Sequence, residues 1–293
     1  MHCAILGIGL GWAALTGNAI AGPTANVPAA IYTDPSTDKD HPARMEVLHI
    51  PSGGVMINGV AYVAAGAGPH PTVLLFHGLP GNEKNLDLAQ AIRRAGWTVV
   101  TFNYRGSWGS PGKYRFRQDL EDGRAAYNFI RDAGEAARLG IDPQHIVLIG
   151  HSLGGWAAAH TAAAEGTAFA LVTICAADMA LLAKAPEADR IKDASENMEA
   201  LAGVTAKSMA DDLLTIADTR LPPLTPRLKD MPYLALTSDD GLGPHTDALV
   251  AAIKQAGGTK VSAQHVATDH PWSDKRIALE ATIINWLQAL KSE

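Results

Sequence analysis

Residues 146–155 of the chain read Ile146-Val147-Leu148-Ile149-Gly150-His151-Ser152-Leu153-Gly154-Gly155. The four apolar residues at the start suit a strand that is buried on both faces, and the alanine-rich stretch Leu153–Ala164 favours a helix. A G-x-S-x-G motif between a strand and a helix predicts a tight turn that lifts the Ser152 hydroxyl clear of the sheet. Gly150 and Gly154 fit this turn because side chains there would collide with the neighbouring strand and helix. Ser152 is therefore the candidate nucleophile.

Short apolar runs of the same kind occur on both sides of this motif. They are Val73–Phe76, Thr98–Phe102, Phe169–Ile174 and Tyr233–Leu236. The other segments with helical character are Asn85–Ala95, Arg117–Asp132, Asp247–Ala256 and Ile277–Leu290. Buried strands that alternate with helices predict an α/β fold with a mostly parallel sheet flanked by helices. Two earlier runs, Met45–Ile50 and Val55–Val63, flank a Gly-Gly turn and predict an N-terminal antiparallel hairpin.

Nearly sixty residues between Ile174 and Tyr233 contain no strand candidate. An unstructured loop of this length is uncommon in a compact domain, so we expect short helices instead. They are predicted at Met179–Ala185, Ser195–Leu201 and Lys207–Ala217. The sequence therefore predicts a helical cap insertion over residues 178–230, within a core formed by residues 45–177 and 231–293.

The first 22 residues contain no Asp, Glu, Lys or Arg and end near Ala19-Ile20-Ala21. This small-x-small pattern after an apolar stretch predicts a signal peptide over residues 1–21 and export to the periplasm or the medium. Residues 22–44 are rich in proline, and we expect an extended leader there. The alternatives are an uncleaved anchor or a mis-assigned start codon, the latter leaving a cytoplasmic protein. Membrane contact is expected only through this N-terminal segment.

Charge and cysteine content narrow the classes of ligand. The 293-residue chain carries a formal net charge of −6 and no cluster of Lys or Arg, whereas a nucleic-acid-binding protein needs a basic face. Cys3 would leave with the signal peptide, and a mature chain with Cys175 alone has no intramolecular disulfide. No set of His, Cys and Glu residues has the spacing of a metal site, so we expect neither a metal nor a cofactor.

Three further motifs accompany the one around Ser152. They are Phe76-His77-Gly78-Leu79-Pro80-Gly81, Thr237-Ser238-Asp239-Asp240-Gly241 and Thr268-Asp269-His270-Pro271. Together and in this order, the four motifs resemble the α/β-hydrolase superfamily, and most of all its esterases and prolyl-oligopeptidase-like serine hydrolases. The resemblance covers about residues 45–290. It implies the α/β-hydrolase fold, with a helical cap and the chain order Ser…Asp…His.

The family resemblance also implies an oxyanion hole made of two main-chain N–H groups. In the family, one N–H belongs to the residue after the glycine of the HG pair, which is Leu79 after Gly78. The second is the N–H of Leu153, at the start of the helix behind Ser152. Two donors held by the fold can bind the tetrahedral oxygen without reorganising.

The resemblance places the triad acid just after the strand Tyr233–Leu236, with a proline four residues further on. The spacing to Pro244 selects Asp240, but a threonine stands where the family usually has glycine, so Asp239 remains an alternative. Asp178 is a third candidate, because some members draw the acid from the end of the preceding strand.

The base of the family lies in a loop before the last helix, which here contains His270. His270 would take the Ser152 proton while Asp240 orients the imidazole. We expect structural roles for Arg105 and for the remaining histidines of the core motifs, namely His77, His151, His160, His245 and His265. Trp108 or Met179 could line an acyl pocket.

A serine nucleophile indicates acyl transfer to water. We therefore expect a carboxylesterase whose partner is a small-molecule ester with a small or medium acyl group. A peptidase or amidase of the prolyl-oligopeptidase-like group is the alternative, and a non-catalytic binding protein on the same fold is the third. The sequence specifies neither the natural substrate nor the oligomeric state.

Overall fold

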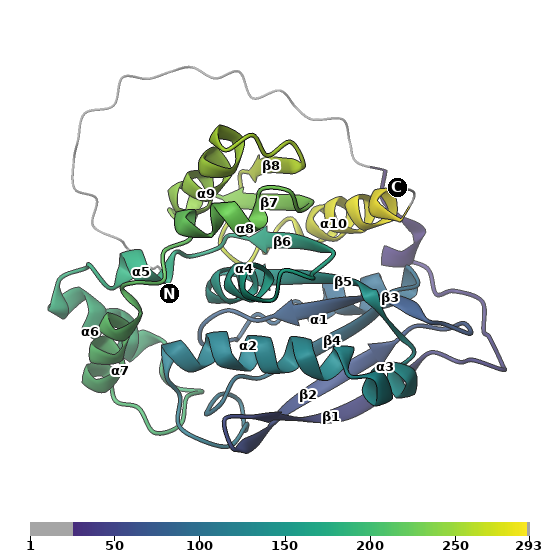
Figure 1. Cartoon of the computed structure of the whole chain (residues 1–293), viewed down its shortest axis with the longest axis horizontal. Helices are drawn as coiled ribbons and strands as arrows, with labels where there is room; N and C mark the ends of the chain where they lie inside the picture. The colour runs from purple at the N-terminus through teal and green to yellow at the C-terminus, as the bar shows by residue number, and fades with distance from the viewer. Residues whose placement is uncertain (1–25, 292–293) are drawn as a thin grey trace.

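The fold is built on one eight-stranded sheet with the strand order β1-β2-β4-β3-β5-β6-β7-β8. The computed structural model describes residues 26–291 (Figure 1), so the predicted signal peptide lies outside the described residues. The strands are β1 (Arg44–Ser52), β2 (Val55–Val63), β3 (His70–Phe76), β4 (Thr98–Phe102), β5 (Ile141–His151), β6 (Ala170–Ile174), β7 (Tyr233–Ser238) and β8 (Val261–Val266). β1 pairs antiparallel with β2, and β2 with β4, whereas the other neighbouring pairs are parallel. The predicted mostly parallel sheet and its N-terminal hairpin are confirmed.

Helices cover both faces of the sheet, as Figure 1 shows. One face carries α1 (Leu86–Arg94) and α10 (Arg276–Leu290), and the other carries α2 (Phe116–Arg131), α3 (Ala133–Leu139), α4 (Leu153–Glu165) and α9 (Gly243–Gln255). Successive side chains of a strand point to opposite faces. In β3, accordingly, Val73 and Leu75 pack under α1 and α10, while Leu74 and Phe76 pack under α2 and α4. Both faces of the central strands are thus buried, which explains their continuous apolar sequence.

The parallel strands bring distant loops to one edge of the sheet. Phe76 at the end of β3 lies in register with Gly150 of β5, and His151 lies in register with Ile174 at the end of β6. Ile174 in turn lies beside Leu236 of β7. The loops that follow these strands therefore lie side by side, although they are far apart in the sequence.

The segment between β6 and β7 contains short helices and no strand. Its α-helices are α5 (Met179–Leu182), α6 (Glu187–Glu196), α7 (Ala206–Asp212) and α8 (Thr225–Leu228), with 3-10 turns at Leu213–Ile216 and Pro222–Leu224. The prediction of a helix at Ser195–Leu201 was wrong, because α6 begins earlier, after Pro186, and ends at Glu196. Ala194 is the one buried residue of α6. Its apolar residues Ala188, Ile191 and Ala194 recur at helical spacing, but they are few and two of them are only alanines, so they are a weak signal for a helix.

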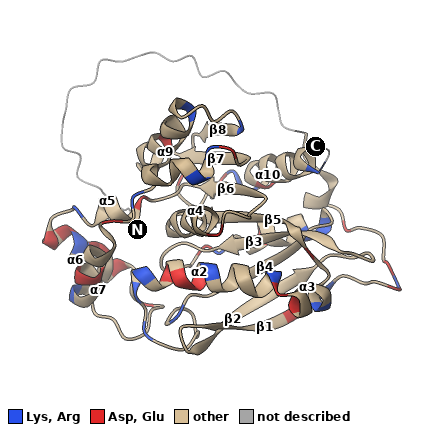
Figure 2. Cartoon of the chain, in the orientation of Figure 1, with Lys and Arg blue, Asp and Glu red and all other residues tan. Residues whose placement is uncertain are grey.

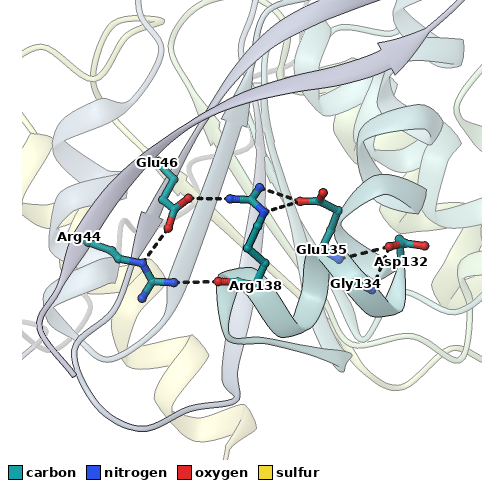
Figure 3. Close-up of polar contacts among 6 residues, drawn as sticks. All are labelled: Arg44, Glu46, Asp132, Gly134, Glu135 and Arg138. Carbon is teal, nitrogen blue, oxygen red and sulfur yellow. Dashed lines mark hydrogen bonds and ion pairs between the residues drawn. The ribbon is translucent and has the colours of Figure 1, made fainter. Parts of the chain in front are cut away.

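A surface network ties the edge strand β1 to helix α3 (Figure 3). Arg138 Nη1 donates to Glu46 Oε2 at 2.6 Å, and Arg138 Nη2 donates to Glu135 Oε2 at 2.6 Å. Arg44 donates to Glu46 at 2.8 Å and to the Arg138 carbonyl at 2.9 Å. Asp132 caps the start of α3 by accepting from the Gly134 N–H at 2.9 Å. The two arginines are exposed to solvent and the two glutamates are partly exposed, so this network contributes modestly to stability.

A second network, around Arg105, is buried. Arg105 Nε donates to Asp122 Oδ1 at 2.6 Å, and the Arg105 main-chain N–H donates to Asp122 Oδ2 at 2.7 Å. The Ser52 hydroxyl also donates to Asp122, at 2.5 Å. Asp122 is fully buried on α2. The pair joins the loop after β4 to α2 and to β1, which is the structural role expected for Arg105.

Charged side chains of both signs are interspersed over the helices, and acidic ones are prominent on α6 and α7 (Figure 2). Within residues 26–291, no helix combines the length and the hydropathy needed to cross a membrane.

The buried and the exposed arginine make a matched pair of stability tests. We expect Arg105→Met to lower the free energy of unfolding by about 3 kcal/mol, because it leaves the Asp122 carboxylate buried without its countercharge. Arg44→Met removes an exposed ion pair and should cost about 0.5 kcal/mol. Urea unfolding followed by circular dichroism measures both, and equal losses would show that the Arg105–Asp122 pair is not the stabilising one.

Candidate active site

Ser152 lies on the turn between β5 and α4, with φ 58° and ψ −123°. A serine seldom adopts a positive φ, so the surrounding packing must hold this strained backbone in place. A Cβ atom on Gly150 would lie 2.1 Å from the Gly154 carbonyl oxygen, and one on Gly154 would lie 2.3 Å from the Phe76 carbonyl oxygen. Only glycine fits at both positions. The two glycines thus bring β5, α4 and the end of β3 into backbone contact.

Main-chain hydrogen bonds fix the turn to the next strand. The Ser152 N–H donates to the Ile174 carbonyl at 2.9 Å. The Ser152 carbonyl accepts from the N–H groups of Gly155 at 3.0 Å and Ala177 at 3.1 Å. The position of Ser152 therefore depends on both its own helix and the loop after β6.

His270 and Asp240 are joined by a short hydrogen bond. His270 Nδ1–H donates to Asp240 Oδ2 at 2.6 Å, and the other Asp240 oxygen accepts from the Leu242 N–H at 2.8 Å. The Asp240 side chain is 4% exposed and that of His270 is 35% exposed. The carboxylate is thus covered, while the imidazole reaches the surface with its second nitrogen available.

The two alternative carboxylates contact other partners. Asp239 Oδ1 lies 2.9 Å from His265 Nε2, in a pair that is more than half exposed to solvent. Asp178 is buried and forms an ion pair with Arg220 Nε at 2.6 Å. Of the three acids considered from the sequence, Asp240 is the one that His270 contacts.

The hydrogen bonds of Asp240 keep it ionised. Burial opposes the ionised form, but the bond from His270 and the bond from the Leu242 N–H outweigh it, and the pKa of Asp240 falls below its ordinary value of 3.8. Asp240 is therefore a carboxylate at neutral pH and can stabilise a positive charge on the imidazole beside it.

Two other histidines of this region are buried and neutral. His151 packs against His270 with ring centroids 4.6 Å apart, and its Nε2–H donates to the His270 carbonyl at 3.0 Å. Burial, and to a lesser degree the neighbouring His270, lowers the pKa of His151 to about 3. Burial also lowers the pKa of His77 to about 4, and its Nδ1–H donates to the Gly78 carbonyl at 2.7 Å. Neither is suited to exchange protons near neutral pH, and His151 instead fixes the backbone of His270.

The loop after β3 passes directly beside the turn that holds Ser152. A Cβ atom on Gly78 would lie 3.0 Å from the Ser152 Cβ. Among the described residues, the main-chain N–H groups of Leu79 and Leu153 donate to no other group. Two free main-chain donors thus flank the candidate nucleophile.

Trp108 and Met179 are the two residues that the sequence offered as the lining of an acyl pocket. Trp108 is 40% exposed, and its indole N–H donates to the Pro80 carbonyl of the loop after β3 at 2.6 Å, whereas Met179 is buried.

The structure brings Ser152 and His270 to the same edge of the sheet without a direct hydrogen bond between them in the described part of the chain. Their connection runs through His151, next to Ser152 in sequence and bonded to the His270 carbonyl. Sequence reasoning missed this contact. It also missed Cys175 and Trp272, which lie close to Asp240 and His270.

Cys175, Asp240 and His270 place one potential metal-ligand atom each within 4.8 Å of one another. Metal binding would require a thiolate at Cys175. Burial raises the pKa of the Cys175 thiol to about 12. The Asp240 and His270 atoms are also engaged with each other. These properties favour a hydrogen-bonded cluster over a metal centre.

A family model described as the alpha/beta hydrolase fold matches residues 71–231. The match covers more than half of the chain, which therefore belongs to the alpha/beta hydrolase fold family.

Two curated relatives, both uncharacterized proteins of Mycobacterium tuberculosis (strains CDC 1551 / Oshkosh and ATCC 25618 / H37Rv), are 30% identical over 121 residues. The match spans 41% of this chain and 41% of the length of each relative.

Solved structures of similar fold include several esterases. An esterase of Pyrobaculum calidifontis has a TM-score of 0.64 at 22% identity, over 86% of this chain and 88% of its own. EstE1, a carboxylesterase from a metagenomic library, has a TM-score of 0.61 at 22% identity, over 84% and 90% of the two chains. Est1E of Butyrivibrio proteoclasticus, solved with ferulic acid bound, has a TM-score of 0.63 at 16% identity, over 84% and 100%. At these identities the likeness is one of fold.

The glycines around Ser152 allow a steric test. Gly154→Ala places a methyl group against the Phe76 carbonyl, and we expect it to lower the free energy of unfolding by about 3 kcal/mol. Gly243→Ala, where the nearest heavy atom would lie at 4.0 Å, should change stability by less than about 0.5 kcal/mol. Thermal denaturation of both variants makes the comparison. A Gly154→Ala protein as stable as the wild type would mean that this contact is not tight.

Proposed function

We propose that the protein is a serine carboxylesterase in which Ser152 is the nucleophile, His270 the general base and Asp240 the acid of the triad. The observation that carries the proposal is the 2.6 Å bond from His270 Nδ1 to Asp240, at the edge of the sheet where Ser152 directly precedes α4. The bond commits the imidazole proton to Nδ1 and leaves Nε2 as a proton acceptor. An unprotonated Nε2 on a partly exposed ring is what a general base requires.

The first half of the proposed reaction forms an acyl-enzyme. His270 Nε2 takes the Ser152 proton as Oγ attacks the ester carbonyl carbon, and the carbonyl oxygen becomes an oxyanion. The N–H groups of Leu79 and Leu153, which donate to no other group among the described residues, would bind that oxygen. Collapse of the intermediate breaks the bond to the alcohol, which leaves with the proton from His270.

The second half repeats these steps with water. His270 takes a proton from the water as its oxygen attacks the acyl carbon, and then returns the proton to Ser152 Oγ as the acid leaves. Asp240 stays ionised throughout and stabilises the imidazolium at each stage. Because catalytic hydrogen bonds are often long before substrate binds, we expect Ser152 and His270 to close their gap in the complex.

An ester is the substrate class we favour over an amide. A serine nucleophile serves both, and the esterase structures of similar fold support an ester for this chain. Turnover of peptide nitroanilides faster than turnover of p-nitrophenyl esters would favour the peptidase alternative instead.

Removal of the nucleophile gives the direct test of the proposal. We expect the wild type to hydrolyse p-nitrophenyl butyrate and to react with a fluorophosphonate probe, and Ser152→Ala to lose both activities while it remains folded. We expect kcat to fall by about 10⁶-fold, the size of loss known for removal of a triad serine. Ser107→Ala, at a buried serine outside the triad, is the control. Ester hydrolysis that persists in Ser152→Ala would remove Ser152 from the mechanism.

The two adjacent aspartates give a paired test of the acid. We expect Asp240→Asn to lower kcat by about 10³–10⁴-fold, because an amide no longer holds the required imidazole tautomer or stabilises its cation. Asp239→Asn, which alters the exposed contact to His265, should change kcat by less than about threefold. Steady-state kinetics on one ester compares them. A larger loss in Asp239→Asn would move the acid by one position.

A further inference from the structure

Five residues other than glycine have a positive φ among the described residues, and three of them, Ser152, Cys175 and Trp272, lie in or next to the loops that carry the proposed triad. Their φ values are 58° for Ser152, 49° for Cys175 and 60° for Trp272. Strained backbone of this kind persists only where the surroundings hold it, and it is concentrated at functional sites. The turn between β5 and α4 accounts for Ser152. Cys175 and Trp272 lie outside that turn, although Ile174 and Ala177, on either side of Cys175, bond to Ser152. The contacts of the Cys175 and Trp272 side chains remain to be explained.

Direct contacts link Cys175 and Trp272 across 97 positions of sequence. The Trp272 indole N–H donates to Cys175 Sγ at 3.3 Å, and both side chains are fully buried. The Ser238 hydroxyl lies 3.2 Å from the same sulfur. Trp272 follows His270 by two residues, and Ser238 precedes Asp240 by two. The sulfur therefore lies between the loop that carries the base and the loop that carries the acid.

The same sulfur also lies next to the acid and the base themselves. Cys175 Sγ, a carboxylate oxygen of Asp240 and a ring nitrogen of His270 are all within 4.8 Å of one another. Two main-chain hydrogen bonds also join these segments. The Cys175 N–H donates to the Leu236 carbonyl of β7 at 2.8 Å, and the Asp239 N–H donates to the Thr268 carbonyl of the base loop at 3.1 Å.

We propose that Cys175 and Trp272 are positioning residues, which hold Asp240 and His270 at hydrogen-bonding distance by fastening the base loop to the end of β6. The inference rests on the proposed roles of Ser152, His270 and Asp240. The Trp272 N–H donates to the sulfur, and Cys175 and Ser238 share a second hydrogen bond in which either the thiol or the hydroxyl is the donor. With a pKa raised to about 12 by burial, Cys175 keeps its thiol proton at neutral pH. The loss of any of these bonds frees the imidazole and the carboxylate to separate.

A pair of tryptophan variants separates positioning from packing. Trp272→Phe removes the indole N–H and keeps an aromatic ring. Trp97→Phe makes the same replacement in the same core, where the buried indole N–H has no partner among the described residues. We expect Trp272→Phe to lower kcat about tenfold with KM unchanged, because the reacting groups are displaced rather than the substrate. Trp97→Phe should leave both constants within about twofold of the wild type.

The low-field proton resonance of the His270–Asp240 hydrogen bond supplies a readout that does not depend on activity. We expect it to move upfield or broaden in Trp272→Phe and to stay in place in Trp97→Phe. At the sulfur, Cys175→Ala should reproduce the loss, whereas Cys175→Ser, which keeps a donor and an acceptor, should restore most of kcat. If Trp272→Phe does not fold, the comparison of Cys175→Ala with Cys175→Ser tests the positioning role by itself.

An unchanged kcat and an unchanged resonance in Trp272→Phe, or in Cys175→Ala, would overturn the positioning role. A failure of the proposed function looks different, since wild-type protein would then not hydrolyse esters or react with a fluorophosphonate. The resonance would still report whether Cys175 and Trp272 hold the pair together.

Discussion

The close approach of three backbone segments at Gly150 and Gly154 is the constraint on which the site depends. A single methyl group at either position would overlap a carbonyl oxygen of α4 or β3. Because there is no room for a side chain, α4 begins directly against the sheet, and Ser152 must take a left-handed backbone to connect it to β5. These contacts fix the relative positions of the start of α4, the loop after β3 and the candidate nucleophile Ser152.

The parallel sheet extends this constraint to the acid and the base. Each strand from β3 to β8 ends beside its neighbour, so the loops after β3, β5, β6, β7 and β8 meet at one edge. Main-chain hydrogen bonds join neighbouring segments at this edge: the Ser152 N–H donates to the Ile174 carbonyl, and the Cys175 N–H donates to the Leu236 carbonyl. The short bond between His270 and Asp240 lies at the end of this series, and His151 connects it back to Ser152.

The sequence predicts what depends on burial over several consecutive residues, and misses what depends on single contacts. The strand before Ser152 could be located because it is apolar on both faces, and the α/β fold could be predicted because such strands alternate with helices along the sequence. Strand β5 nevertheless begins at Ile141, five residues earlier than its apolar run, because Ile141 pairs with His70 of β3 through main-chain atoms, whereas the intervening residues 142–145 are mostly exposed and carry no apolar pattern. Helix α6 was misplaced because its apolar side consists of only Ala188, Ile191 and Ala194 and it buries only Ala194. The Trp272–Cys175 contact could not be predicted from the sequence either, since no periodicity relates residues 97 positions apart.

A structure of the protein after reaction with a fluorophosphonate would test the central claim most directly. The proposed mechanism predicts a covalent bond from Ser152 Oγ to phosphorus, with the phosphonyl oxygen within hydrogen-bonding distance of the Leu79 and Leu153 N–H groups and His270 Nε2 facing Ser152 Oγ. A phosphonate bound to another residue, or one whose oxygen points away from both N–H groups, would contradict it.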